Sequence, residues 1–237
     1  MSKPTIVLVH GAFADGSSWS QVARRLLDAG YTVKVPPLGN HSLVADGAYI
    51  KSVVEQIDGP VLLAGHSYGG AVITVAGTAQ NAVGLVFAAA YVPDEGETLT
   101  ELGAKFPDSD LGPHLVFSTY PVEGADPGTE LSVDPAAFPT IFADGVDPEL
   151  AKVLAVSQRP AGGLALNEPA PAAAWKTIPS WGIVSTNDRT LQPDMERFGY
   201  TRAGARKVIE LPSSHLVMLA HPNEVAAFID EIATELS

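Results

Sequence analysis

Ser67 lies in the stretch GHSYG, residues 65–69, whose residue types suit nucleophilic catalysis. The apolar run before it, residues 61–64, predicts a buried strand, and the small residues after it predict a helix from about 69 to 79. A G-x-S-x-G pattern can arise by chance in a glycine-rich chain. At a strand-to-helix turn, however, the glycines let strand and helix pack closely and hold the hydroxyl out. The sequence therefore predicts Ser67 as a nucleophile.

A serine hydroxyl needs a general base, and the base needs an acid that orients it. Asp188 follows a predicted strand in STNDRTLQP, and His215 follows the last predicted strand in LPSSHLVML. Because the carboxyl ends of parallel strands meet at one edge of a sheet, both side chains are expected near Ser67. The sequence predicts a catalytic triad of Ser67, Asp188 and His215.

The sequence offers one alternative for the acid and one for the base. Asp94, after the strand that ends in YVP, is an alternative acid, and His221 is an alternative base. His221 directly precedes a proline and a predicted helix, which favours a role at the helix start. His10 and His66 flank the site and are expected to organise local hydrogen bonds.

An oxyanion in the transition state needs two hydrogen-bond donors. The backbone N–H of Tyr68, the residue after the nucleophile, is the first prediction. The second is the backbone N–H of Phe13, in the loop HGAFADG after the first strand. Phe13, Tyr68 and Leu216 adjoin catalytic positions, so all three are also predicted to line the substrate pocket.

The order of elements predicts how these residues are positioned. Strand and helix patterns alternate through the first ninety or so residues, which indicates an α/β protein with a parallel sheet covered by helices on both faces. From 93 to 179 the pattern dissolves, and 12 of the 19 prolines lie there. Regular strands and helices then return. We expect a core of residues 1–92 and 176–237 with an inserted cap of residues 93–175, whose aromatic residues wall a pocket or form the cap's own core.

Composition narrows the classes of function. With 46% hydrophobic and 17% charged residues, the chain is expected to fold into a globular domain. Its formal net charge of −13 would repel nucleic acid phosphates and anionic lipid surfaces, so neither is expected as a partner. The chain has no cysteine, which excludes disulfides and thiolate sites. We expect a cytoplasmic protein, since no signal-peptide or membrane-spanning pattern is present.

The motifs HGAF, GHSYGG, STNDRTLQP and SSHLVMLAHP together resemble those of the α/β-hydrolase superfamily, in the same order. The tail SSHLVMLAHPNEV resembles the small-cap branch that holds plant methylesterases and hydroxynitrile lyases. Lyases of that branch have a threonine in place of Gly11 and a lysine in place of Leu216. The resemblance therefore implies an α/β-hydrolase fold that hydrolyses esters, with no metal and no organic cofactor.

Together these features predict a serine hydrolase that cleaves small, fairly apolar carboxylic esters through an acyl-enzyme on Ser67. The same triad could instead open lactones, hydrolyse a C–C bond of a diketone or perform perhydrolysis, and the sequence does not separate these reactions. A hydroxynitrile lyase or a ligand-binding, receptor-like protein is a weaker alternative. The oligomeric state is open, a homodimer included.

Overall fold

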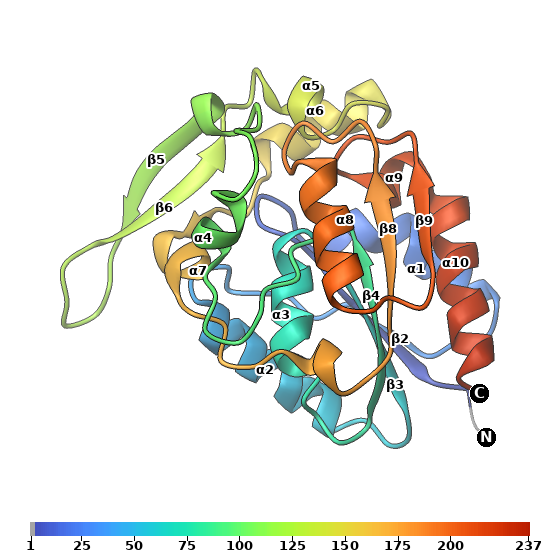
Figure 1. The fold of residues 1–237 in the computed structure, drawn as a ribbon. Helices are drawn as coiled ribbons and strands as arrows, with labels where there is room; N and C mark the ends of the chain where they lie inside the picture. Colours follow the sequence, from blue (N-terminus) through green and yellow to red (C-terminus); the bar gives the residue numbers. More distant parts are fainter. Residues whose placement is uncertain (1–2) are drawn as a thin grey trace.

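A computed structural model describes residues 3–237 of the chain. In this described part, six strands form the main sheet in the order β2-β1-β3-β4-β8-β9, and every neighbouring pair is parallel (Figure 1). The predicted parallel sheet is confirmed. Its strands are β1 (Thr5–Val9), β2 (Val33–Lys34), β3 (Val61–His66), β4 (Ala82–Ala88), β8 (Ser180–Ser185) and β9 (Val208–Leu211).

The inner strands of this sheet are continuously apolar because both of their faces are covered. All residues of β1, β3 and β8 are buried, as is nearly all of β4. The register pairs Val9 with Gly65 and His66 with Ala88, so the strand ends on which the predicted site depends lie side by side.

Helices cover both faces of the sheet. Helices α1 and α10 pack against each other on one face, whereas α2 packs against α3, which lies with α8 on the other face (Figure 1). The bounds of these helices are α1 (Ser20–Asp28), α2 (Leu43–Glu55), α3 (Tyr68–Ala76), α8 (Pro193–Arg202) and α10 (Pro222–Glu235). A short helix, α9 (Val217–Ala220), precedes α10. The doubly covered sheet agrees with the expected fold class.

A 3₁₀ turn, η1 (Gly16–Trp19), precedes the first helix. The Asp15 side chain caps that turn by accepting a hydrogen bond of 2.7 Å from the Ser17 N–H. Helix α1 follows directly at Ser20.

Between β4 and β8 the chain leaves the main sheet. The predicted cap, residues 93–175, lies in this interval, and within the described chain it contains a separate antiparallel sheet of the order β5-β6-β7. The sequence did not predict this sheet. The elements are α4 (Leu99–Gly103), η2 (Gly112–His114), β5 (Leu115–Tyr120), β6 (Gly128–Val133), α5 (Phe138–Ile141), α6 (Pro148–Val156), β7 (Ala161–Gly162), α7 (Gly163–Asn167) and η3 (Ala174–Lys176).

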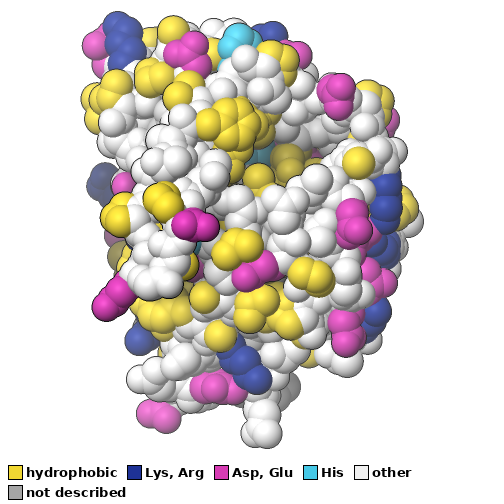
Figure 2. All heavy atoms as spheres, turned by 90° about the vertical axis from the view of Figure 1, so that its left-hand side faces the viewer, with side chains coloured by type: hydrophobic (Ala, Val, Ile, Leu, Met, Phe, Trp, Pro, Cys, Tyr) yellow, Lys and Arg dark blue, Asp and Glu magenta, His cyan; other side chains and the backbone are white. Residues whose placement is uncertain are grey.

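The face that bears these elements is hollowed. Figure 2 shows a recess in its upper half, bordered by hydrophobic and uncharged side chains, with acidic side chains scattered farther out. None of the helices within residues 3–237 combines the length and the apolar character that crossing a bilayer requires.

Candidate active site

Ser67 occupies the turn between β3 and α3 in an unusual backbone conformation. Its φ of 53° and ψ of −121° lie outside the regions that most residues adopt. The turn is held by the Ser67 carbonyl, which accepts hydrogen bonds from the N–H groups of Gly70 (2.9 Å) and Tyr91 (3.2 Å). The surrounding structure thus imposes the conformation that a strand-to-helix nucleophile turn requires.

Two glycines make this turn possible. A Cβ atom at Gly65 would lie 2.4 Å from the Gly69 carbonyl oxygen, and one at Gly69 would lie 2.5 Å from the Val9 carbonyl oxygen. Backbone atoms at such distances cannot be displaced cheaply, so both positions exclude any side chain. The spacing of glycines around Ser67 is therefore a packing requirement of β1, β3 and α3.

Asp188 and His215 form a buried pair at the carboxyl edge of the sheet. Asp188 follows β8, His215 follows β9, and the His215 Nδ1–H donates to Asp188 Oδ2 at 2.6 Å. The other carboxylate oxygen, Oδ1, accepts from the N–H groups of Thr190 (2.7 Å) and Leu191 (3.0 Å). Three N–H donors therefore hold the Asp188 carboxylate in place. The structure brings together these two of the three predicted catalytic residues.

His215 Nε2 is buried and has no hydrogen-bond partner in the described chain. No hydrogen bond to Ser67 Oγ is formed in this resting structure. The two residues are nevertheless neighbours, since the His66 Nε2–H donates to the His215 carbonyl at 2.9 Å and the His66 and His215 ring centroids are 4.6 Å apart. Catalytic hydrogen bonds are often long without substrate and tighten in the complex.

The alternative acid, Asp94, and the alternative base, His221, have other partners. Asp94 forms an ion pair with Lys176 on the surface, and this hydrogen bond lowers the pKa of the Asp94 carboxyl. His221 lies 3.9 Å from the Glu224 carboxylate at the start of α10. Neither residue contacts the Asp188–His215 pair.

Two further histidines act within the local hydrogen-bond network. His10 Nε2 accepts from the Leu38 N–H at 3.0 Å, so its proton is on Nδ1, which donates to the Gly11 carbonyl at 2.9 Å. Burial lowers the pKa of His10, and burial together with His215 lowers that of His66 well below its usual range. Both rings are therefore neutral and hold the loops on either side of Ser67.

The structure bears on the N–H groups predicted as oxyanion donors. The Phe13 N–H already donates to the Arg159 carbonyl at 3.0 Å, so this predicted donor is occupied. Within residues 3–237, the N–H groups of Ala12 and Tyr68 have no acceptor, and both residues line the cavity at Ser67. These two N–H groups are therefore available beside Ser67.

A cavity of about 50 Å³ adjoins Ser67 and is mostly apolar. Phe13 and Tyr68 line it, as the sequence predicts, but Leu216 does not. Leu216 is buried at the start of α9, where its N–H donates to the Phe142 carbonyl at 3.2 Å. Leu216 follows His215 in the sequence, but the side chains of consecutive residues point in different directions. The Leu216 side chain is therefore packed in the core and not in the cavity. The lining residues are Ala12, Phe13, Ser67, Tyr68, Tyr91, Leu111, Leu115, Leu166, Thr190 and Leu191.

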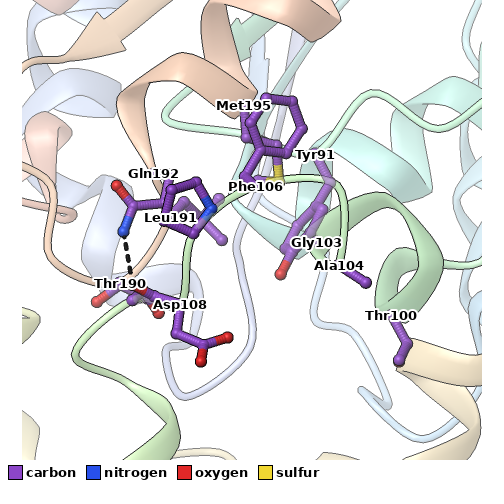
Figure 3. A pocket seen from close by; sticks show the side chains of 12 residues that line it. Tyr91, Thr100, Gly103, Ala104, Phe106, Asp108, Thr190, Leu191, Gln192 and Met195 are labelled. Carbon is purple, nitrogen blue, oxygen red and sulfur yellow. Dashed lines mark hydrogen bonds between the residues drawn. The ribbon is translucent and has the colours of Figure 1, made fainter.

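A second pocket, of about 300 Å³, shares Tyr91, Thr190 and Leu191 with this cavity. We call it the outer pocket; it lies between α4 with the following cap loop and the start of α8 (Figure 3). The Gln192 side chain bridges the two parts by donating to the Asp108 carbonyl at 2.9 Å. The lining residues are Tyr91, Thr100, Gly103, Ala104, Phe106, Pro107, Asp108, Ser109, Thr190, Leu191, Gln192 and Met195.

Sequence reasoning missed one carboxyl group at this site. Glu196 is buried on α8, and its Oε2 accepts from the Ser185 N–H at 3.0 Å. Met195, Glu196, Gly199 and Tyr200 are the buried residues of this helix. A carboxyl group within such a helical stripe of buried residues is the signal that could have drawn attention to it.

The chain matches the alpha/beta hydrolase family over residues 6–228 and belongs to it. A carbendazim hydrolyzing esterase of Nocardioides sp. (strain SG-4G) is 35% identical over 116 residues, which are 40% of this chain and 46% of that protein. The matched segment thus covers less than half of that relative.

Solved structures resemble the whole fold. A polyneuridine aldehyde esterase superposes with a TM-score of 0.83 at 22% identity, covering 98% of this chain and 100% of that chain. A methylesterase from Arabidopsis superposes with a TM-score of 0.78 at 18% identity, covering 98% and 99%. At such identities the likeness concerns the fold, and the predicted α/β-hydrolase fold is confirmed.

Proposed function

We propose that this protein is a serine esterase that hydrolyses small, neutral carboxylic esters through an acyl-enzyme on Ser67. The observation that carries the proposal is the buried Asp188–His215 pair, whose outward Nε2 has no hydrogen-bond partner in the described chain and lies beside the strained Ser67 turn. An orienting acid, a base and a nucleophile at the carboxyl edge of one parallel sheet are the parts that acyl transfer needs. Family membership and the printed names of the three relatives described above support the same reaction class.

The mechanism proceeds in two halves. His215 Nε2 takes the Ser67 hydroxyl proton while Oγ attacks the ester carbonyl, and the oxyanion forms against the Ala12 and Tyr68 N–H groups. The C–O bond to the alcohol then breaks, and the alcohol leaves with the proton from His215. In the second half a water molecule gives a proton to His215 and attacks the acyl-enzyme. The acid is released and the Ser67 hydroxyl is restored.

The two cavities favour esters in which the groups on the two sides of the ester bond differ in size. A small apolar group would fit the cavity of about 50 Å³ at Ser67, and a bulkier group would extend past Tyr91 into the outer pocket of about 300 Å³. No Lys or Arg lines either cavity, and Asp108 lines the outer one. A carboxylate on the substrate would be repelled by Asp108 and would find no Lys or Arg in either cavity to pair with. Neutral substrates are therefore preferred over anionic ones.

Labelling with a serine-directed phosphonate tests this function. We expect hydrolysis of p-nitrophenyl acetate and butyrate, loss of activity with the phosphonate, and attachment of the label to the peptide that contains Ser67. Ser67→Ala should lower kcat by more than about a thousandfold and abolish labelling, with an unchanged folded spectrum. Ser118→Ala, on the exposed strand β5, is the matched control and should retain both. Turnover that survives in Ser67→Ala would refute the proposed acyl-enzyme.

A further inference from the structure

Glu196 is a carboxyl group with no contact to solvent. It lies on α8 directly behind the catalytic acid, and its exposed fraction is 0%. Oε2 accepts the Ser185 N–H at 3.0 Å, whereas Oε1 is buried without any partner in the described chain. A buried, ionised carboxylate with an unsatisfied oxygen would be very costly.

The carboxylate of Asp188 is the neighbour that resolves this problem. Glu196 and Asp188 meet at Ser185, whose N–H donates to Glu196 Oε2 at 3.0 Å and whose carbonyl accepts from the Asp188 N–H at 3.1 Å. Two negative carboxylates this near each other in a buried site would repel each other, so a proton between them is favoured. Asp188 already accepts three N–H groups, whereas Glu196 has an unpartnered oxygen that can carry this proton.

The other groups around Glu196 do not change this assignment. Arg197, the next residue on α8, is held at the surface by Glu210 and Asp194 at 2.8 Å each. The Tyr200 hydroxyl accepts from the Ala90 N–H and donates to the Ile183 carbonyl. Burial and the charge on Asp188 raise the pKa of Glu196 well above its usual range.

We propose that Glu196 is a positioning residue that stays protonated at neutral pH and donates a hydrogen bond from Oε1 to the Asp188 carboxylate. This inference rests on the proposed function, since it concerns the acid of the same triad. Glu196 then fixes the carboxylate from behind while His215 contacts it from the front. Loss of the proton at alkaline pH would place two negative charges side by side and push Asp188 out of line with His215.

Tyrosine ionisation does not compete with this transition. Burial and then the Asp188 charge raise the pKa of Tyr91, which lines both cavities, to about 12. Burial followed by the Glu196 charge raises that of Tyr200 well above its ordinary value. Both tyrosine hydroxyls should therefore stay neutral at every pH below the ordinary tyrosine pKa of about 10.

Three variants and a pH profile test the inference. Glu196→Gln keeps both hydrogen bonds and should retain kcat within about threefold at neutral pH, whereas Glu196→Ala should lose about tenfold in kcat with little change in KM. The fall of kcat at alkaline pH should disappear in Glu196→Gln. Glu210→Gln, an exposed carboxyl next to the same Arg197, is the control that should keep it. An alkaline fall with the same midpoint in wild type and Glu196→Gln would overturn the proposal.

Infrared spectroscopy gives a readout that does not depend on turnover. Wild type at neutral pH should show the band of a protonated, buried carboxyl group, and Glu196→Gln should lack it. Absence of this band from wild type would refute the neutral form of Glu196. If the band is present but no ester is turned over, the proposed function fails while the protonation of Glu196 stands.

Discussion

The chemistry of Ser67 depends on backbone conformation as much as on residue type. A φ of 53° at a residue other than glycine costs about 1–3 kcal/mol, which the rest of the fold must supply. The hydrogen bonds from Gly70 and Tyr91 to the Ser67 carbonyl are part of that supply. A strained conformation of this kind persists only where many surrounding contacts hold it in place. Here it directs the Ser67 hydroxyl toward the cavity that Ala12 and Tyr68 line.

Glu196 should make stability depend on pH in a direction opposite to most carboxyls. Because its pKa is raised on folding, its contribution is fully present below the unfolded pKa of about 4.3 and is lost as pH rises through the folded pKa. Glu196→Gln removes this loss. The free energy of unfolding of Glu196→Gln minus that of wild type should grow by about 1.4 kcal/mol for each pH unit between about pH 4.3 and the folded pKa of Glu196.

Urea titrations of both proteins at about pH 5 and about pH 7 measure this difference. The gap between the two proteins should be wider at the higher pH. A gap that stays constant would mean that Glu196 ionises equally in the folded and unfolded chain.

Single residues differ in how far the sequence reveals them. Asp188 and His215 could be predicted because each comes within four residues of the end of a strand, and strand ends share an edge. The predicted oxyanion donor after the first strand could not be fixed to one residue, because the Phe13 N–H meets Arg159, far away in the sequence. Glu196 is close to Asp188 in the sequence, but only the folded chain shows that α8 directs this side chain to the end of β8.

At the scale of elements, the crossing of β3 and α3 tolerates no side chain at Gly65. Gly65→Ala should lower the free energy of unfolding by about 3 kcal/mol or more, because the new methyl group would lie 2.4 Å from the Gly69 carbonyl oxygen. Gly103→Ala is the matched control at the end of α4, where a Cβ meets no atom within 4 Å. It should raise stability by about 0.5 kcal/mol.

Equilibrium unfolding in urea compares these two alanine variants with wild type. Equal effects of the two substitutions would show that the close approach around Gly65 relaxes at little cost.

The second sheet was missed because its edge strand lacks the usual signal. A half-buried strand alternates apolar and polar residues, but the interior of β5 is exposed and Phe117 is 66% exposed. Strand β6 alternates only at its end, and β7 has two residues. The main sheet, in contrast, has continuously buried strands whose apolar runs are evident in the sequence.

At the scale of the whole molecule, substrate choice depends on how the cap meets the core. Ala104 lines the outer pocket from the cap side, and Ala104→Trp should fill much of its space. We expect kcat/KM for 1-naphthyl acetate relative to methyl acetate to fall by about tenfold or more, because only the bulky ester extends past Tyr91. Steady-state kinetics on both esters measure the ratio.

Ala136→Trp, at an exposed turn of the cap away from this pocket, controls for the added tryptophan. It should leave the ratio of the two esters as in wild type. If Ala104→Trp also leaves the ratio of kcat/KM for the two esters unchanged, the outer pocket does not hold the bulky part of the substrate.

The hydrogen bond from the Phe13 N–H to the Arg159 carbonyl has a consequence for engineering. It ties the loop that presents Ala12 to a residue contributed by a different part of the chain. A cap from another protein grafted onto this core must therefore supply a carbonyl group that accepts the hydrogen bond of the Phe13 N–H, in addition to forming the pocket entrance. Chimaeras that retain residues around 159 should keep their rate on the simplest esters, and those that replace them should forfeit it.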